Sequence, residues 1–156
     1  MFSIGDTVCY PLHGVGKIIA IEDKEVCGRS STYYVIQSVT QKMTILLPIE
    51  TAESAGLRSV VSPDMYPKFL EYYKTAEVNI GDSNWNQRYR ENMAKLRSGD
   101  LFSVIDVILC LTKRNSMRTL SSQERKMLLN ARSFLSSELA ESTGKSEQEI
   151  ESAFIR

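Results

Sequence analysis

The stretch VVSPDMYPKFL, residues 60–70, marks a change in the hydrophobic pattern of this chain of 156 residues. Before it, apolar residues alternate with a period of about two, and after it they recur with a period of about 3.6. Ser62 and Pro63 are residue types preferred at the N-cap and at the first position of a helix. The sequence therefore predicts a β domain over residues 1–61 and a helical domain over residues 62–156.

The residues before Ser62 form short extended segments that are rich in Val, Ile, Tyr and Thr. These segments are TVCYPL (7–12), GVGKIIAIED (14–23), TYYVIQSV (32–39) and MTILLPI (43–49). The glycines of GVGK are expected at a turn, and Gly28 is expected to supply a positive φ at a hairpin tip. The predicted fold class is α+β: a small SH3- or Tudor-like β-barrel followed by an all-α helical bundle.

The residues after Ser62 carry the start and stop signals of several helices. The predicted helices span about 64–74, 83–97, 101–117 and 122–143, with a short helix before the C-terminus. Asp82 or Ser83 is expected to cap the second helix and Asp100 the third, while Ser121 with Glu124 and Ser146 with Glu149 form capping boxes. The inward-facing stripes of the two longest helices are expected to be Leu101, Val104, Ile105, Ile108 and Leu111 or Thr112, and Met127, Leu128, Ala131, Phe134, Leu135 and Leu139.

The composition indicates an ordinary globular protein with nineteen basic and nineteen acidic residues. Three widely spaced cysteines, Cys9, Cys27 and Cys110, fit reduced thiols that act as small core residues in a cytoplasmic protein. The first residues lack a signal-peptide pattern, and the longest apolar run, 104–111, is too short to span a bilayer. We therefore expect a soluble cytoplasmic protein that does not associate with membranes.

Three local patterns imitate known sites of catalysis or metal binding, and each lacks a required part. The GKS of residues 144–146 has Leu139 where a P-loop has glycine, and GVGK has Ile19 where a dinucleotide fingerprint has glycine. Cys9, His13 and Cys27 match no metal-ligand spacing. The sequence predicts no enzyme, no metal, no cofactor and no small-molecule substrate.

The zero net charge conceals a basic region in the helical part. Between Asn84 and Arg132 there are ten basic and four acidic residues, a surplus of six positive charges. Such a surface suits a phosphate backbone, although a charged helix face can also be merely solvated. Trp85, the single tryptophan, begins a helix in this region and could stack on a base, wedge into a minor groove or pack into the core.

Four blocks together resemble the CarD/CdnL family of bacterial transcription regulators over nearly the full chain. The blocks are GDTVCYPLHGVGKIIAIE (5–22), TILLPIETAESAGLRSVVS (44–62), NWNQRYRENMAKLRSGD (84–100) and LSSQERKMLLNARSFLSSELA (120–140). The resemblance implies an N-terminal Tudor-like domain that binds the RNA polymerase β subunit. It also implies a helical domain that contacts promoter DNA at the upstream edge of the transcription bubble, weakly and without sequence specificity. The protein would stabilise the open complex together with the housekeeping sigma holoenzyme.

The same resemblance implies the residues of two contact surfaces. The polymerase surface would comprise Lys24, Glu25, Val26, Thr44, Ile45 and Leu46. The DNA surface would comprise Trp85, Arg88, Arg90, Lys95, Arg125 and Lys126. An alternative function remains, a Tudor-like protein-binding adaptor whose helical bundle does not contact DNA and whose Trp85 belongs to the core.

Overall fold

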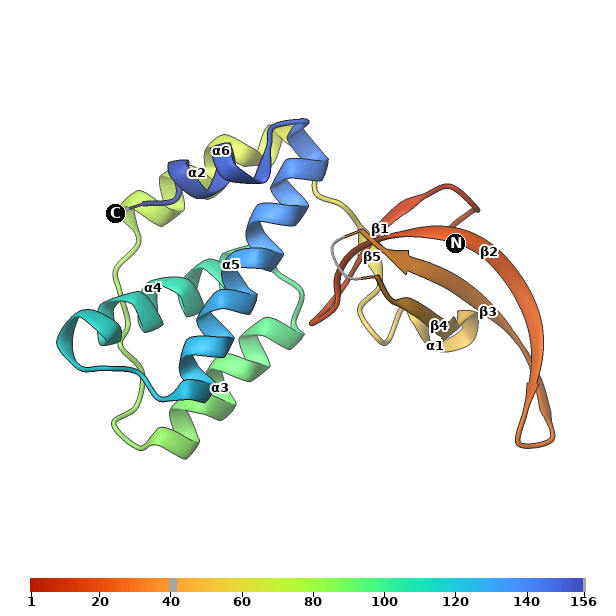
Figure 1. The fold of residues 1–156 in the computed structure, drawn as a ribbon, viewed down its shortest axis with the longest axis horizontal. Coiled ribbons are helices and arrows are strands. Elements are labelled where there is room, and N and C mark those ends of the chain that lie inside the picture. Colours follow the sequence, from red (N-terminus) through yellow and green to blue (C-terminus); the bar gives the residue numbers. More distant parts are fainter. Residues whose placement is uncertain (40–41, 156) are drawn as a thin grey trace. The chain divides into compact units, whose positions relative to one another are not determined.

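The computed structural model describes residues 1–39 and 42–155, which form two compact units, Met1–Val60 and Val61–Arg156 (Figure 1). The first unit is built mainly from strands and the second from helices. The chain is therefore α+β, with the two classes of element segregated along the sequence.

The N-terminal unit is an antiparallel sheet with the strand order β4-β3-β2-β1-β5. Its strands are β1 (Thr7–Tyr10), β2 (Gly14–Val26), β3 (Arg29–Ser38), β4 (Thr44–Pro48) and β5 (Arg58–Ser59). Strands β4 and β5 are the two edges, so the described sheet is open and the predicted closure into a barrel is not observed. After Pro48 the chain turns directly into a short helix, α1 (Ile49–Ala52), rather than continuing as a strand that could reach β5.

Alternate residues of the central strands and of α1 supply the core of this unit. Val8, Ile18, Tyr34, Ile36 and Leu47 are buried together with Ala52 and Leu57. Gly16 lies within β2, where a Cβ would stand 2.5 Å from the Ile36 side chain. The GVGK segment is therefore the start of a strand, not the expected turn, and Gly16 permits the close approach of β2 and β3.

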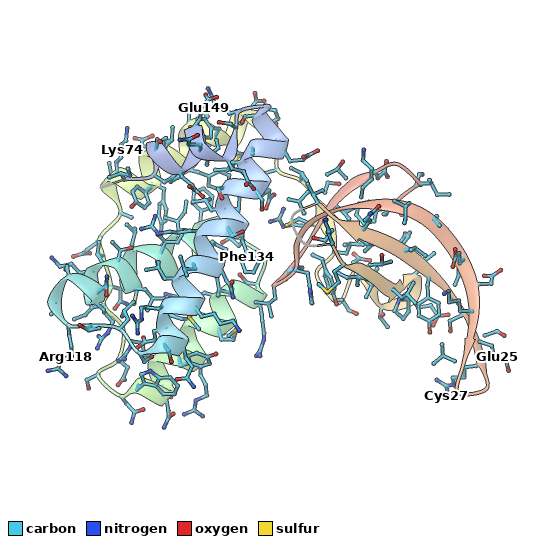
Figure 2. The ribbon with its side chains drawn as sticks, viewed as in Figure 1. Glu25, Cys27, Lys74, Arg118, Phe134 and Glu149 are labelled. Carbon is cyan, nitrogen blue, oxygen red and sulfur yellow. The ribbon has the colours of Figure 1, made fainter. Side chains whose placement is uncertain are left out.

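Strands β2 and β3 form a long curved hairpin whose tip carries Glu25 and Cys27 (Figures 1 and 2). Cys27 and Gly28 have φ values of 54° and 77°, as a two-residue hairpin turn requires, which confirms the positive φ predicted for Gly28. Cys9 and Cys110 are buried, but Cys27 is exposed. The prediction that Cys27 is a core residue is wrong because a side chain at a hairpin tip cannot reach the core.

The C-terminal unit begins with a short 3₁₀ turn, Pro63–Met65, and contains five helices. They are α2 (Tyr66–Thr75), α3 (Trp85–Arg97), α4 (Leu101–Met117), α5 (Ser122–Thr143) and α6 (Glu147–Ala153). Asp100, Ser121 and Ser146 cap their helices as predicted, whereas Ser62 caps the 3₁₀ turn that precedes α2. Helix α3 is capped by Asn84, whose side chain accepts the Gln87 N–H, and not by Asp82 or Ser83.

Helices α4 and α5 cross and provide most of the core of this unit (Figure 1). In the predicted stripe of α4 every apolar residue up to Leu111 is buried, and the alternative last member, Thr112, is exposed. In the stripe of α5, Leu128 and Phe134 are only partly buried. In the described part of the chain, no helix has both the length and the hydrophobicity needed to cross a membrane.

Candidate functional site

Trp85 is the first residue of α3 and is neither fully exposed nor part of the core. Its indole stacks on Tyr89, one turn later, with ring centroids 5.1 Å apart and an interplanar angle of 18°. The indole N–H donates a hydrogen bond of 3.2 Å to the hydroxyl of Ser121, the N-cap of α5. The ring is therefore braced from two sides while part of it faces solvent.

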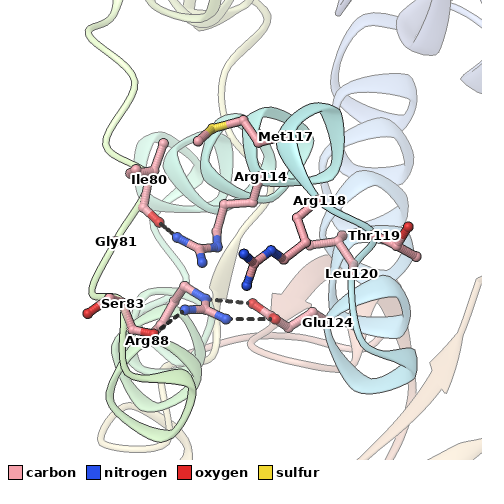
Figure 3. A pocket seen from close by; sticks show the side chains of 10 residues that line it. All are labelled: Ile80, Gly81, Ser83, Arg88, Arg114, Met117, Arg118, Thr119, Leu120 and Glu124. Atoms are coloured by element: carbon pink, nitrogen blue, oxygen red, sulfur yellow. Dashed lines mark hydrogen bonds and ion pairs between the residues drawn. The ribbon is translucent and has the colours of Figure 1, made fainter.

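Arg88 lies on the other side of the first turn of α3 and is only 5% exposed. Its Nε and one terminal nitrogen donate to the two carboxylate oxygens of Glu124, at 2.9 and 3.0 Å (Figure 3). The other terminal nitrogen donates to the backbone oxygen of Asp82 at 2.8 Å. These hydrogen bonds with Glu124 raise the pKa of the Arg88 guanidinium, although burial acts in the opposite direction. Arg88 thus joins α3 to α5 and is not presented to an external phosphate.

Glu124 has a different role from the one that the capping-box pattern predicts. Its backbone N–H donates to the Ser121 hydroxyl, as in a capping box. Its carboxylate, which is 3% exposed with the rest of the residue, binds Arg88. The Glu124 carboxylate binds Arg88 rather than a backbone N–H of the helix end. The reason is that a buried guanidinium without a carboxylate costs more free energy than a backbone amide without one.

The remaining predicted DNA residues divide into two groups. Arg90 on α3 and Arg125 and Lys126 on α5 are exposed. Arg125 lies one turn after Ser121, the residue that holds the Trp85 indole. Lys95 is partly buried and follows Arg90 by five residues, about 140° around the helix. The structure therefore brings Trp85 and Arg125 to the same joint between α3 and α5, and places Lys95 on a different side of α3 from Arg90.

The residues predicted for the polymerase surface lie on two strands separated by β3. Leu46 pairs with Val35, and Lys24 pairs with Ser31, four positions away along β3. Four residues of a strand span about 13 Å. The two groups are therefore not adjacent, although both lie on strand edges: β4 is an edge of the described sheet, and β1 pairs with β2 only at residues 14–17.

The strand register also separates these residues by face. Positions two or four apart along β3 point to the same side of the sheet, so Lys24, Val26, Thr44 and Leu46 share one face. Val26 and Leu46 are 50% and 45% exposed, respectively. Glu25 and Ile45 point to the opposite face, where Ile45 packs against the core.

Sequence reasoning missed the residues that hold the site in place. Tyr89 is signalled by an aromatic pair at i and i+4, a spacing that brings side chains together on a helix. Ser121 and Glu124 carry no such signal, because they contact Trp85 and Arg88 across 36 residues of sequence. Within residues 1–39 and 42–155, no three His, Cys, Asp or Glu side chains are grouped so that they could hold a metal ion.

Two family models match the chain, one for each unit. The CarD-like/TRCF RID domain matches residues 2–61, and the CarD C-terminal domain matches residues 69–154. The putative transcription factor YdeB of Bacillus subtilis (strain 168) is 34% identical over 152 residues, which cover 97% of this chain and 99% of that protein.

Two solved structures of N-terminal domains from Myxococcus xanthus are also similar to part of the chain. The solution structure of the 72-residue CarD N-terminal domain is 29% identical, with a TM-score of 0.34, and the match covers 38% of this chain and 79% of that one. CdnLNt is 39% identical, with a TM-score of 0.34, and the match covers 40% of this chain and 87% of that one.

Proposed function

The chain belongs to the CarD/CdnL family of transcription factors, and from that premise we propose that it binds the RNA polymerase β subunit and stabilises the promoter open complex. The N-terminal unit makes the polymerase contact. The helical unit contacts DNA at the upstream edge of the transcription bubble, in the context of the housekeeping sigma holoenzyme. The protein acts in the cytoplasm, at the nucleoid, and it acts by binding rather than by catalysis.

Two features of the sheet support the polymerase contact. The match to the CarD-like/TRCF RID domain covers residues 2–61. In addition, β4 is a free edge in the described sheet, and such an edge can pair with a strand of a partner. Lys24, Val26, Thr44 and Leu46 supply side-chain contacts from one face, while Glu25 and Ile45 contribute through their position in the strands.

The observation that carries the DNA contact is the braced, partly exposed indole of Trp85. A ring that stacks on a base or wedges into a groove must keep its orientation, and Tyr89 and Ser121 fix it on two sides. Arg90, Arg125 and Lys126 are exposed cations that can neutralise phosphates near it. Lys95 extends this surface only along a second side of α3. Arg88 contributes indirectly, because it joins the start of α3 to Glu124 on α5.

The mechanism combines a weak DNA contact with a strong tether. Binding to polymerase holds the helical unit near the bubble, so that an affinity too weak for binding alone becomes effective at high local concentration. Trp85 then slows reannealing of the upstream DNA and prolongs the open complex.

Replacing Trp85 by alanine tests this function. Stacking of one base is worth about 1–3 kcal/mol, so the variant should shorten the open-complex lifetime at least about fivefold. Polymerase binding should be unchanged, and Trp85→Phe, which can still stack on Tyr89, should retain much of the effect. The measurement is the decay of open complexes after addition of a competitor.

The control is the thermal unfolding of each variant, which shows whether the helical unit stays folded. An unchanged open-complex lifetime in a folded, polymerase-bound Trp85→Ala protein would contradict the DNA contact. The protein-binding adaptor would then be the better assignment.

A further inference from the structure

The helical unit contains a cavity of about 410 Å³ that is distinct from the exposed face of Trp85. Its walls come from the segment before α3, the end of α4 and the start of α5 (Figure 3). The cavity is open to solvent along part of its wall, and its volume lies in the range of small-molecule pockets.

Three guanidinium groups converge on this cavity, from Arg88, Arg114 and Arg118 (Figure 3). The single carboxylate of the lining belongs to Glu124, and both of its oxygens are bound by Arg88. Arg114 and Arg118 therefore leave the lining with an excess of two positive charges, and Glu124 is not available to neutralise them.

The two remaining arginines are suited to different tasks. Arg114 is partly buried and donates a 2.8 Å hydrogen bond to the backbone oxygen of Ile80, which fixes its orientation and leaves further N–H groups free. Arg118 is exposed, and in the described residues it forms no ion pair or hydrogen bond through its side chain. The Arg114 guanidinium is thus held in place, and the Arg118 guanidinium is able to move toward a bound ligand.

The remaining walls favour an organic anion over a simple ion. Ile80 and Met117 line the cavity beside the arginines and offer apolar surface. Leu120 and Glu124, which also line it, place the N-terminal end of the 22-residue helix α5 at the cavity wall, where its dipole favours negative charge. Guanidinium groups bind phosphate oxygens in pairs and also stack on flat rings.

We propose that this cavity binds a small phosphorylated organic molecule, with Arg114 and Arg118 holding its di- or triphosphate group. Met117 and Ile80 contact the organic part. Apart from Arg88, whose guanidinium is bound to Glu124, the lining residues lie outside the sets assigned to DNA and polymerase, so the cavity gives the helical unit a ligand of its own.

The test is calorimetric titration of the full chain with sodium pyrophosphate, and then with ADP, at constant ionic strength. Pyrophosphate should bind saturably, and Arg118→Ala should weaken binding at least tenfold. The matched control is Lys113→Ala, which removes an exposed cation of α4, five residues before Arg118, that does not line the cavity and should change binding less than twofold. ADP should bind more tightly than pyrophosphate, and Met117→Ala should weaken ADP alone.

Several results would overturn the proposal. They are no saturable binding of pyrophosphate, equal binding by wild type and a folded Arg118→Ala variant, or ADP affinity no better than that of pyrophosphate. The binding of a promoter duplex by the same proteins is measured as a further test. If Arg118→Ala weakens duplex binding while pyrophosphate does not bind the wild-type chain, Arg118 belongs to the DNA surface and the small-molecule site is rejected.

Discussion

At the scale of single residues, Arg88 and Glu124 form the contact that joins the start of α3 to the start of α5. Both side chains are almost fully buried, and two hydrogen bonds connect them. Taking two charges out of water is costly, and their attraction offsets this cost only while both are present. Removing only one of the two residues should therefore destabilise the helical unit, because the other would remain as an unpaired buried charge.

Removing Glu124 should destabilise the helical unit strongly. Glu124→Ala leaves the Arg88 guanidinium buried without its carboxylate, so the free energy of unfolding should fall by about 3–5 kcal/mol. Glu141→Ala, which removes an exposed carboxylate from the same helix, should change it by less than about 0.5 kcal/mol. Urea denaturation followed by fluorescence measures both.

The double variant Arg88→Met with Glu124→Leu separates the pair from its parts. Because no charge is left buried, it should recover most of the stability lost in Glu124→Ala. A double variant as unstable as the single one would show that packing around these side chains, and not the unpaired charge, accounts for the loss.

Residue chemistry alone could not separate Trp85 from Arg88. Both stand in the first turn of a basic helix, and the family resemblance assigns both to the DNA surface. They differ because Glu124, 36 residues after Arg88, is brought against only one of them. Helix start signals are local and were predictable, whereas this partner is set by the packing of α3 on α5.

At the scale of elements, helices α2 and α4 are joined by a hydrogen bond from the Tyr72 hydroxyl to the Asp106 carboxylate, 2.5 Å long. This hydrogen bond, together with burial and the nearby carboxylates of Asp106 and Asp100, raises the pKa of Tyr72 from 10.0 to about 12. The phenol must keep its proton to donate, so the contact holds only while Tyr72 is neutral.

This contact predicts a pH dependence of stability in the alkaline range. Between about pH 10 and 12 the folded chain retains a proton that the unfolded chain releases, so the contribution is complete below pH 10 and is lost as the pH rises through 12. Thermal unfolding should show a steeper loss of stability over this range in wild type than in Tyr72→Phe. Equal slopes in the two proteins would contradict the assignment.

Helix caps were predictable because their signal is local in the sequence. Closure of the sheet into a barrel was not, because it depends on contacts between distant strands. The caps Ser62, Asp100, Ser121 and Ser146 follow from residue type and spacing. The barrel does not, because alternation marks strands without saying whether the first and last strands meet. The helix α1 was missed because a four-residue helix is too short to show a period of 3.6.

At the scale of the whole molecule, the connection between the two units is very short. Strand β5 ends at Ser59, and Val61 is already fixed to α5. The Val61 N–H donates to the Glu138 carboxylate at 2.9 Å, and the Ser142 hydroxyl donates to the Val61 backbone oxygen at 2.6 Å. Val60 is thus the one residue between a sheet pairing and a helix contact.

Lengthening this connection should reduce function without affecting either contact. Six Gly and Ser residues inserted after Val60 add roughly 13 Å of flexible reach, which lowers the local concentration of the helical unit at the bubble. The open-complex lifetime should shorten, while polymerase binding and the stability of each unit stay unchanged. The same insertion after Gly144, inside the helical unit, is the control and should leave the lifetime close to that of wild type if the protein folds. An unaltered lifetime with the long connection would rule out a requirement for a short tether.

The position of Trp85 also makes the protein its own optical probe. The single tryptophan of the chain sits at the joint of α3 and α5, beside Tyr89 and Ser121, and the N-terminal unit has none. Its emission therefore reports on the helical unit alone and records any movement of this joint. Unfolding curves followed by tryptophan emission and by far-ultraviolet circular dichroism can accordingly reveal whether the two units lose their structure together or in sequence.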